Sequence, residues 1–136
     1  MPKSSIEFAM AAELHEMWRK SYRHPFIASG DIVPPRMKPD GIGGQINIDQ
    51  PFHMLTPKWQ AENLAAAHAA LDAVRMFPRD MEAQSAYIHD QWMTRNPLAE
   101  WNAAQHVPYD ALPESEKEKD RVHARLARRY LDLYSI

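Results

Sequence analysis

The sequence predicts a mainly α-helical single domain in which a unit of two helices joined by a loop occurs twice. Apolar residues recur at spacings of three and four through four long segments, which is the spacing of one helix face. Proline, threonine or aspartate stands where several of these segments begin, as at the start of many helices. In two segments, an aliphatic residue, a histidine, an acid and a variable residue precede a tryptophan. These observations together predict two similar helix pairs around a shared core.

The first helix is predicted over about residues 5–22. Met10, Leu14, Met17 and Trp18 lie at helical spacing and form its apolar face. Pro25 lacks a backbone N–H group, so it and the residues after it are expected to end the helix.

A long loop is predicted over residues 23–55, which contain all four glycines and five of the eleven prolines. Loops of this length are uncommon inside compact domains and are often functional. Residues 46–48 alternate in polarity and predict a short extended piece. The glycine-rich run 41–44 could cradle a phosphate with its amides, but no helix follows it, so a turn-rich loop is favoured.

Three further helices are predicted in the rest of the chain. The second begins at Thr56-Pro57 and ends near Met76, and the third covers Met81 to about Arg95, with Asp80 as its cap. The fourth runs from near Pro113 to about Tyr134. The residues expected to face inward are Leu64, Ala67, His68, Leu71 and Val74 on the second helix, Met81, Ile88 and Trp92 on the third, and Val122, Leu126, Tyr130 and Leu133 on the fourth.

Two sequence patterns occur twice and in the same order. Residues 14–18 match residues 88–92, and the proline-aromatic-x-x-leucine segment 51–55 matches 108–112, with Thr56 as a one-residue insertion before the next proline. We therefore predict a first unit at about residues 5–76 and a second at about 80–134. Neither pair can bury its tryptophan-bearing face alone, so the units should pack about a pseudo-twofold axis with Trp18 and Trp92 in equivalent buried places.

Composition narrows the class of protein. A chain of 136 residues with 45% apolar and 25% charged residues is typical of one globular domain. It has no cysteine, which excludes disulfides and thiolate zinc sites, and no apolar run long enough to cross a membrane. The acids near the N-terminus do not fit a signal peptide, so a cytoplasmic location is expected.

Charge and histidine spacing argue against several kinds of site. The net charge of −2 gives no general attraction to nucleic acid or to anionic membranes. The seven histidines include no His-x-x-x-His pair, so no metal ion or other cofactor is predicted. His15 and His89 are expected to form structural hydrogen bonds with a carbonyl or carboxylate. No catalytic set of residues stands out, and no enzyme activity is predicted.

The second unit resembles the RyR domain, the short repeat of ryanodine receptors that also occurs in small bacterial and phage proteins. The resemblance covers about residues 85–134 and rests on residues 88–92 and on residues 106–121, which include the segment Pro-Tyr-Asp-Ala-Leu-Pro-Glu. The family's loop usually has glycines around its tryptophan, whereas residues 96–105 have none, and Trp101 is given that tryptophan's place. The first unit keeps only part of the pattern, at His15, Glu16, Trp18, Glu62 and Asn63. The resemblance implies a helical fold and a recognition role without an established catalytic mechanism.

The candidate site is a cationic, aromatic-lined pocket for a nucleotide-like or phosphorylated ligand. Its residues are Trp92, Trp101, Tyr109, Lys117, Asp120 and Arg121, and the equivalent positions in the first unit are Trp18, Phe52, Glu62 and Asn63. The competing interpretation is that Lys117, Asp120 and Arg121 form ion pairs with Glu62 or Asp90.

The sequence leaves three hypotheses for the function. The first is a non-catalytic module that binds a nucleotide-like ligand or a protein partner, in a phage or mobile-element setting. The second is a self-assembling structural protein, such as a homodimer, without a ligand. The third is nucleic-acid binding through the arginines at 121, 125, 128 and 129, which is not favoured and would show a steep salt dependence.

Overall fold

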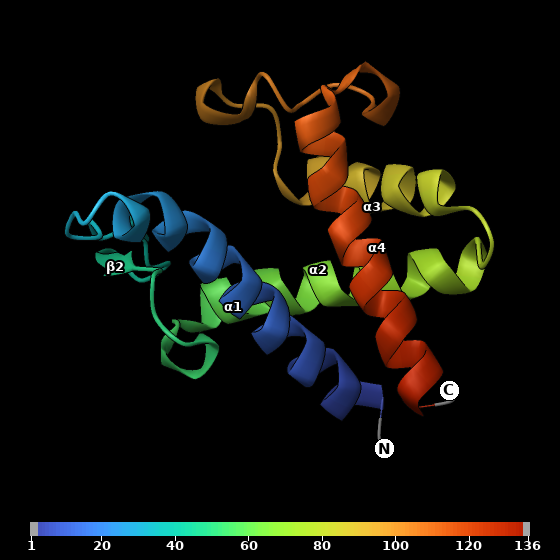
Figure 1. The fold of residues 1–136 in the computed structure, drawn as a ribbon, viewed down its shortest axis with the longest axis horizontal. Coiled ribbons are helices and arrows are strands. Elements are labelled where there is room, and N and C mark those ends of the chain that lie inside the picture. The colour runs from blue at the N-terminus through green and yellow to red at the C-terminus, as the bar shows by residue number, and fades with distance from the viewer. Residues whose placement is uncertain (1–2, 135–136) are drawn as a thin grey trace. The chain divides into compact units, whose positions relative to one another are not determined.

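The computed structural model describes residues 3–134 and confirms the mainly α-helical fold (Figure 1). About 68% of the chain is helical. The helices are α1 (Lys3–Ala28), α2 (Pro57–Met76), α3 (Met81–Arg95) and α4 (Glu114–Tyr134). Two short strands, β1 (Met37–Pro39) and β2 (Gln45–Asn47), and three 3-10 turns, η1 (Phe52–Met54), η2 (Glu100–Asn102) and η3 (Tyr109–Ala111), complete the described elements.

The chain divides into two compact parts, and the boundary between Ala65 and Ala66 falls inside α2. We refer to the described residues 3–65 as the N-terminal part and to residues 66–134 as the C-terminal part. That the chain forms one domain with units at about 5–76 and 80–134 stays a prediction, as does the pseudo-twofold axis. None of the helices in the described residues is both long and apolar enough to cross a membrane.

Helix α1 continues past Pro25, and the prediction that this proline ends the helix is wrong. Pro25 lies in the last turn, where its missing N–H group removes only one backbone hydrogen bond. Phe26 extends the row of rings on α1, with its centroid 5.6 Å from that of Tyr22. The chain then turns at Gly30, whose φ of 75° favours glycine and whose amide donates to the carbonyl of Ile27 at 3.0 Å.

The long loop of the N-terminal part contains a small hairpin. Strands β1 and β2 are antiparallel, with Lys38 opposite Ile46, so the predicted extended piece has a partner that the sequence did not reveal. The Asp40 carboxylate closes the turn by accepting hydrogen bonds from the amides of Ile42 and Gly44, at 2.8 and 2.9 Å. These amides would otherwise be available to a phosphate, so the contacts favour the turn-rich interpretation of residues 41–44.

The remaining helices have the bounds that their end signals predict. Asp80 caps α3, since its carboxylate accepts a hydrogen bond from the Ala83 amide at 3.0 Å. In the C-terminal part, α3 packs against α4 (Figure 1). Some predicted core residues are not buried, because Met81 and Leu133 lie near the outer ends of their helices and His68 faces solvent. The buried residues of α3 and α4 are Gln84, Ser85, Ile88, His89, Ala124, Leu126, Ala127, Tyr130 and Leu131.

The segments before α2 and α4 have the same local geometry. Pro51 and Pro108 both have φ −54° and ψ 148°, and each precedes a one-turn 3-10 helix that begins with a buried aromatic residue. Turn η1 contacts α1 within the N-terminal part, as η3 contacts α3 within the C-terminal part.

Equivalent positions in the two segments lie 57 residues apart, as Pro51 and Pro108 do. The same spacing continues into α2 and α4. Pro57 therefore corresponds to Glu114, and the one-residue insertion predicted at Thr56 is wrong. Five of the six buried positions of α2 follow the same spacing: 67, 69, 70, 73 and 74 on α2 correspond to 124, 126, 127, 130 and 131 on α4. The sixth, Leu71, corresponds to Arg128, which is half-buried. These matches support the duplication, which stays a prediction.

Candidate functional site

A buried histidine stacked on a tryptophan occurs once in each part of the chain. His15 on α1 donates from Nε2 to the carbonyl of Gln50, and His89 on α3 donates to that of Val107, both at 2.7 Å. The rings of His15 and Trp18 stack at 5.6 Å and 18°, and those of His89 and Trp92 at 5.7 Å and 15°. The predicted structural hydrogen bonds are confirmed, and burial lowers the pKa of His15. Each histidine thus fixes the orientation of a neighbouring indole.

Neither tryptophan is fully buried, and this part of the prediction is wrong. Trp18 and Trp92 are both half-buried, whereas Leu14 and Ile88, one turn earlier on the same helices, are buried. An indole is too large to be covered completely at the edge of so small a core. Each indole therefore keeps part of its surface open to solvent.

In the C-terminal part, two further aromatic rings contact Trp92. The Trp101 ring meets it edge to face, with centroids 6.4 Å apart and an interplanar angle of 85°. The His106 ring lies 6.3 Å from Trp92 at 50°. Trp101 is 68% exposed. We name this group of His89, Trp92, Trp101 and His106 the Trp92 corner.

Asn102 holds the loop that carries Trp101. Its side chain is fully buried, its Oδ1 accepts a hydrogen bond from the Ala99 amide at 2.8 Å, and its Nδ2 donates to the carbonyl of Pro97 at 3.2 Å. A buried amide with both ends engaged fixes the surrounding backbone. The exposed indole therefore projects from a defined turn.

Asp120 on α4 lies behind the Trp92 corner. Its Oδ2 is 3.8 Å from Nδ1 of His89, and its side chain is 15% exposed. Burial, with a smaller contribution from the nearby Glu116 carboxylate, raises the pKa of Asp120 to about 7. Its carboxyl group is thus close to half-protonated at neutral pH, next to the histidine that supports Trp92.

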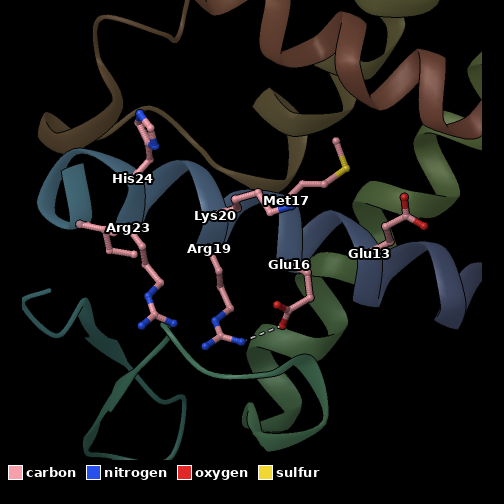
Figure 2. Close-up of a pocket in the computed structure, with 8 residues that line it drawn as sticks. Glu13, Glu16, Met17, Arg19, Lys20, Arg23 and His24 are labelled. Atoms are coloured by element: carbon pink, nitrogen blue, oxygen red, sulfur yellow. Dashed lines mark hydrogen bonds and ion pairs between the residues drawn. The ribbon is translucent and has the colours of Figure 1, made fainter.

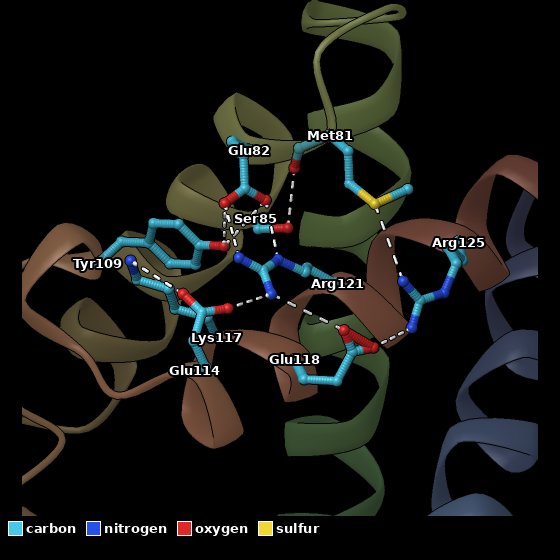
Figure 3. A network of polar contacts seen from close by, with 9 residues as sticks. All are labelled: Met81, Glu82, Ser85, Tyr109, Glu114, Lys117, Glu118, Arg121 and Arg125. Carbon is cyan, nitrogen blue, oxygen red and sulfur yellow. Dashed lines mark hydrogen bonds and ion pairs between the residues drawn. The ribbon is translucent and has the colours of Figure 1, made fainter.

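Tyr109, Lys117 and Arg121 form a separate polar group (Figure 3). Arg121 donates from Nε and Nη2 to the two carboxylate oxygens of Glu82 at 2.9 and 2.8 Å, and from Nη1 to Glu114 at 2.8 Å. The Tyr109 hydroxyl also donates to Glu82, at 3.1 Å, and Nζ of Lys117 lies 5.4 Å from the centre of the Tyr109 ring. We name these five residues the Arg121 cluster.

Arg121 forms ion pairs, as the competing interpretation of the sequence predicted. The partners that it predicted are wrong. The partners are Glu82, Glu114 and, at 3.9 Å, Glu118 within the C-terminal part, in place of Glu62 or Asp90. The hydrogen bonds from Arg121 lower the pKa of the Glu82 and Glu114 carboxyl groups. The six predicted site residues thus fall into two groups, one at or behind the Trp92 corner and one in the Arg121 cluster.

The four equivalent residues of the N-terminal part differ in their contacts from those of the C-terminal part. Phe52 is buried and meets Phe8 edge to face at 6.2 Å. Asn63, the equivalent of Asp120, donates from Nδ2 to the carbonyl of Trp59 in its own helix at 3.0 Å, and Glu62 is half-buried beside it. Trp18 is the member of this set whose stack resembles that in the C-terminal part.

Sequence reasoning missed two features. His106 received no role, although it begins the motif that contains Tyr109. A hollow of about 680 Å³ lies along α1 (Figure 2), where Arg19 donates to the carboxylates of Glu16 at 2.8 Å and of Asp49 at 3.0 Å. The hollow is lined by Glu13, Glu16, Met17, Arg19, Lys20, Arg23, His24 and Ile27. The lining holds two acids and four basic residues, and both of its arginines are already paired with carboxylates, so its charges indicate no single class of ligand.

No group of three or more histidines or acids in the described residues could hold a metal ion. Comparison with known proteins yields no match to any family model, to any curated protein or to any solved structure.

Proposed function

We propose that the C-terminal part is a non-catalytic, RyR-like binding module that holds the planar ring of a nucleotide-like ligand at the Trp92 corner. The observation that carries the proposal is the exposed Trp101 indole, held at a right angle to the half-buried Trp92. Stacking of a nucleobase on an aromatic side chain contributes about 1–3 kcal/mol. Two indoles at a right angle offer one surface for stacking and one for an edge contact.

His106 supports a ligand that is polar as well as planar. Its Nε2 is buried and has no hydrogen-bond partner among the described residues. A buried polar atom generally requires a partner, and an unsatisfied one costs about 1–3 kcal/mol. A nucleobase carries donors and acceptors along its edge and would supply that partner once the atoms that cover this nitrogen move aside.

The Arg121 cluster argues for recognition of the ring over recognition of a phosphate. Arg121 already donates to two carboxylates, so a phosphate would have to displace Glu82 or Glu114. We therefore expect nucleosides to bind about as tightly as their monophosphates. A phosphate-directed site would instead lose most of its affinity for the nucleoside.

Isothermal titration with the four nucleoside monophosphates and their nucleosides tests the proposal. At least one pair should bind, and Trp101→Ala should weaken that binding by about 10-fold or more, which corresponds to the loss of one stacking contact. Leu98→Ala is the matched control, since Leu98 is 67% exposed in the same loop and lies outside the corner. No binding by the wild-type protein, or equal binding by Trp101→Ala, would refute the proposal.

The alternative function is self-assembly or binding of a protein partner through the same loop. The exposure of both Leu98 and Trp101 favours it, because neighbouring exposed apolar side chains often mark an interface. Light scattering separates the two functions. A dimer that both Trp101→Ala and Leu98→Ala convert to a monomer would favour the alternative, whereas a monomer at high concentration would exclude self-assembly.

A further inference from the structure

In the N-terminal part, two rings stack on the tryptophan that follows the buried histidine. On α1, Trp18 stacks with His15 one turn before it and with Tyr22 one turn after it. The Trp18 and Tyr22 rings are almost parallel, at 5.3 Å and 5°. The Tyr22 hydroxyl is anchored by donating to the carbonyl of Pro34 at 2.7 Å. A side chain four residues after the tryptophan can therefore place a ring on the side of the indole that is away from the histidine.

The C-terminal part repeats only the first half of this stack. His89 lies parallel to Trp92, as His15 does to Trp18. Four residues after Trp92, the chain has Asn96, which caps the end of α3 with φ −123° and ψ 81° and supplies no ring. Trp101 and His106 meet Trp92 at 85° and 50°, so neither ring takes the parallel position that Tyr22 takes on Trp18.

We infer that the ring of the ligand stacks on the side of Trp92 away from His89, in the position that Tyr22 occupies on Trp18, and that Asn96 keeps this position open. The inference rests on the proposed function and specifies where its ligand lies. Trp101, held edge to face with Trp92, then forms a side wall for the bound ring. His106 lies beside the same indole, and its buried Nε2 has no hydrogen-bond partner among the described residues.

Asn96 is thus assigned as a residue that determines access to the site, and the assignment can be tested without touching either tryptophan. Asn96→Tyr should supply from within the chain the ring that Tyr22 supplies in the N-terminal part. Asn96→Ala is the matched control, because both variants lose the hydrogen bond from Nδ2 to the Trp92 carbonyl, 3.0 Å long. That carbonyl keeps its hydrogen bond from the backbone amide of residue 96 at 2.9 Å, so both variants should fold.

The experiment is isothermal titration of the two variants and the wild type with the four nucleoside monophosphates. Asn96→Tyr should weaken binding by about 10-fold or more, whereas Asn96→Ala should stay within about 2-fold of the wild type. In the unliganded Asn96→Tyr variant, nuclear Overhauser contacts between the new tyrosine ring and the Trp92 indole should show that the ring occupies the predicted position.

The possible failures are distinguishable. If the wild type binds and Asn96→Tyr binds equally well while its new ring contacts Trp92, the inference is wrong and the proposed function stands. Equal weakening by Asn96→Ala and Asn96→Tyr would also overturn it, because a lost amide would then explain the effect. If the wild type binds none of the four monophosphates, the proposed function itself fails.

Discussion

Asp120 and His123, both on α4, should change the free energy of unfolding in opposite directions between pH 4 and pH 7. Burial raises the pKa of Asp120 from 3.8 to about 7 in the folded protein. Between these values the folded state holds a proton that the unfolded state releases. The stability from Asp120 is therefore fully present below pH 3.8 and is lost as the pH rises through 7. At 1.36 kcal/mol per pKa unit, it amounts to about 4 kcal/mol.

His123 acts in the opposite sense. Burial, with a smaller contribution from the charge of Arg95, lowers its pKa from 6.5 to about 4. Its Nδ1 is buried and has no hydrogen-bond partner among the described residues, so nothing there offsets the desolvation of the cation. The stability from a neutral His123 is present above pH 6.5 and is lost as the pH falls through 4. It amounts to about 3 kcal/mol.

In the wild type the two contributions should nearly cancel, and single variants should reveal each one. Urea unfolding of Asp120→Asn, His123→Gln and the wild type, measured from pH 4 to pH 7, gives differences in which the other titrating groups cancel. Relative to the wild type, Asp120→Asn should lose about 3 kcal/mol as the pH falls from 7 to 4, and His123→Gln should gain about 3 kcal/mol. Parallel stability curves for Asp120→Asn and the wild type would refute the protonation of Asp120 in the folded state.

Four further substitutions test local packing in the two parts of the chain, each by urea unfolding at neutral pH. Asn102→Ala leaves the Ala99 amide without its acceptor and should cost about 1–3 kcal/mol; a neutral effect would show that the loop is held otherwise. Glu82→Gln should cost about 1 kcal/mol or less because that side chain is 56% exposed, and a loss above about 3 kcal/mol would contradict this. Gly41→Ala and Gly43→Ala both place a side chain at positive φ and should each cost about 1 kcal/mol. Gly41→Ala should cost more, since its Cβ would lie 3.0 Å from Lys58 and the other would meet nothing within 4 Å, so equal costs would argue against this contact.

The helices could be predicted because their signals are local. Asp80 caps α3 and Pro57 begins α2, and both residues act on the backbone within one turn. Pro25 misled the prediction because local chemistry favours an end there, whereas the packing of Phe26 on Tyr22 accompanies a helix that continues. Only the second strand of the hairpin was predicted, because the pairing of Lys38 with Ile46 joins two separate segments and leaves no local pattern.

The site was only partly predictable, for a geometric reason. Asp120 and Arg121 are neighbours in the motif, but successive residues of a helix point about 100° apart. Asp120 therefore reaches His89 while Arg121 reaches Glu82, which lies 39 residues away in the sequence. The motif indicated which residues matter but not which of them share a site. The role of His106 depends on its contact with Trp92 across the loop, which no local pattern shows.

The binding of a planar ring at the Trp92 corner is tested most directly by the indole N–H resonances of the ¹⁵N-labelled protein. The chain has four tryptophans, so four signals report separately on Trp18, Trp59, Trp92 and Trp101. During titration with the nucleoside monophosphate that binds most tightly, the signals of Trp92 and Trp101 should shift while those of Trp18 and Trp59 stay unchanged. Binding that shifts Trp18 or Trp59 and leaves Trp92 unchanged would contradict the account.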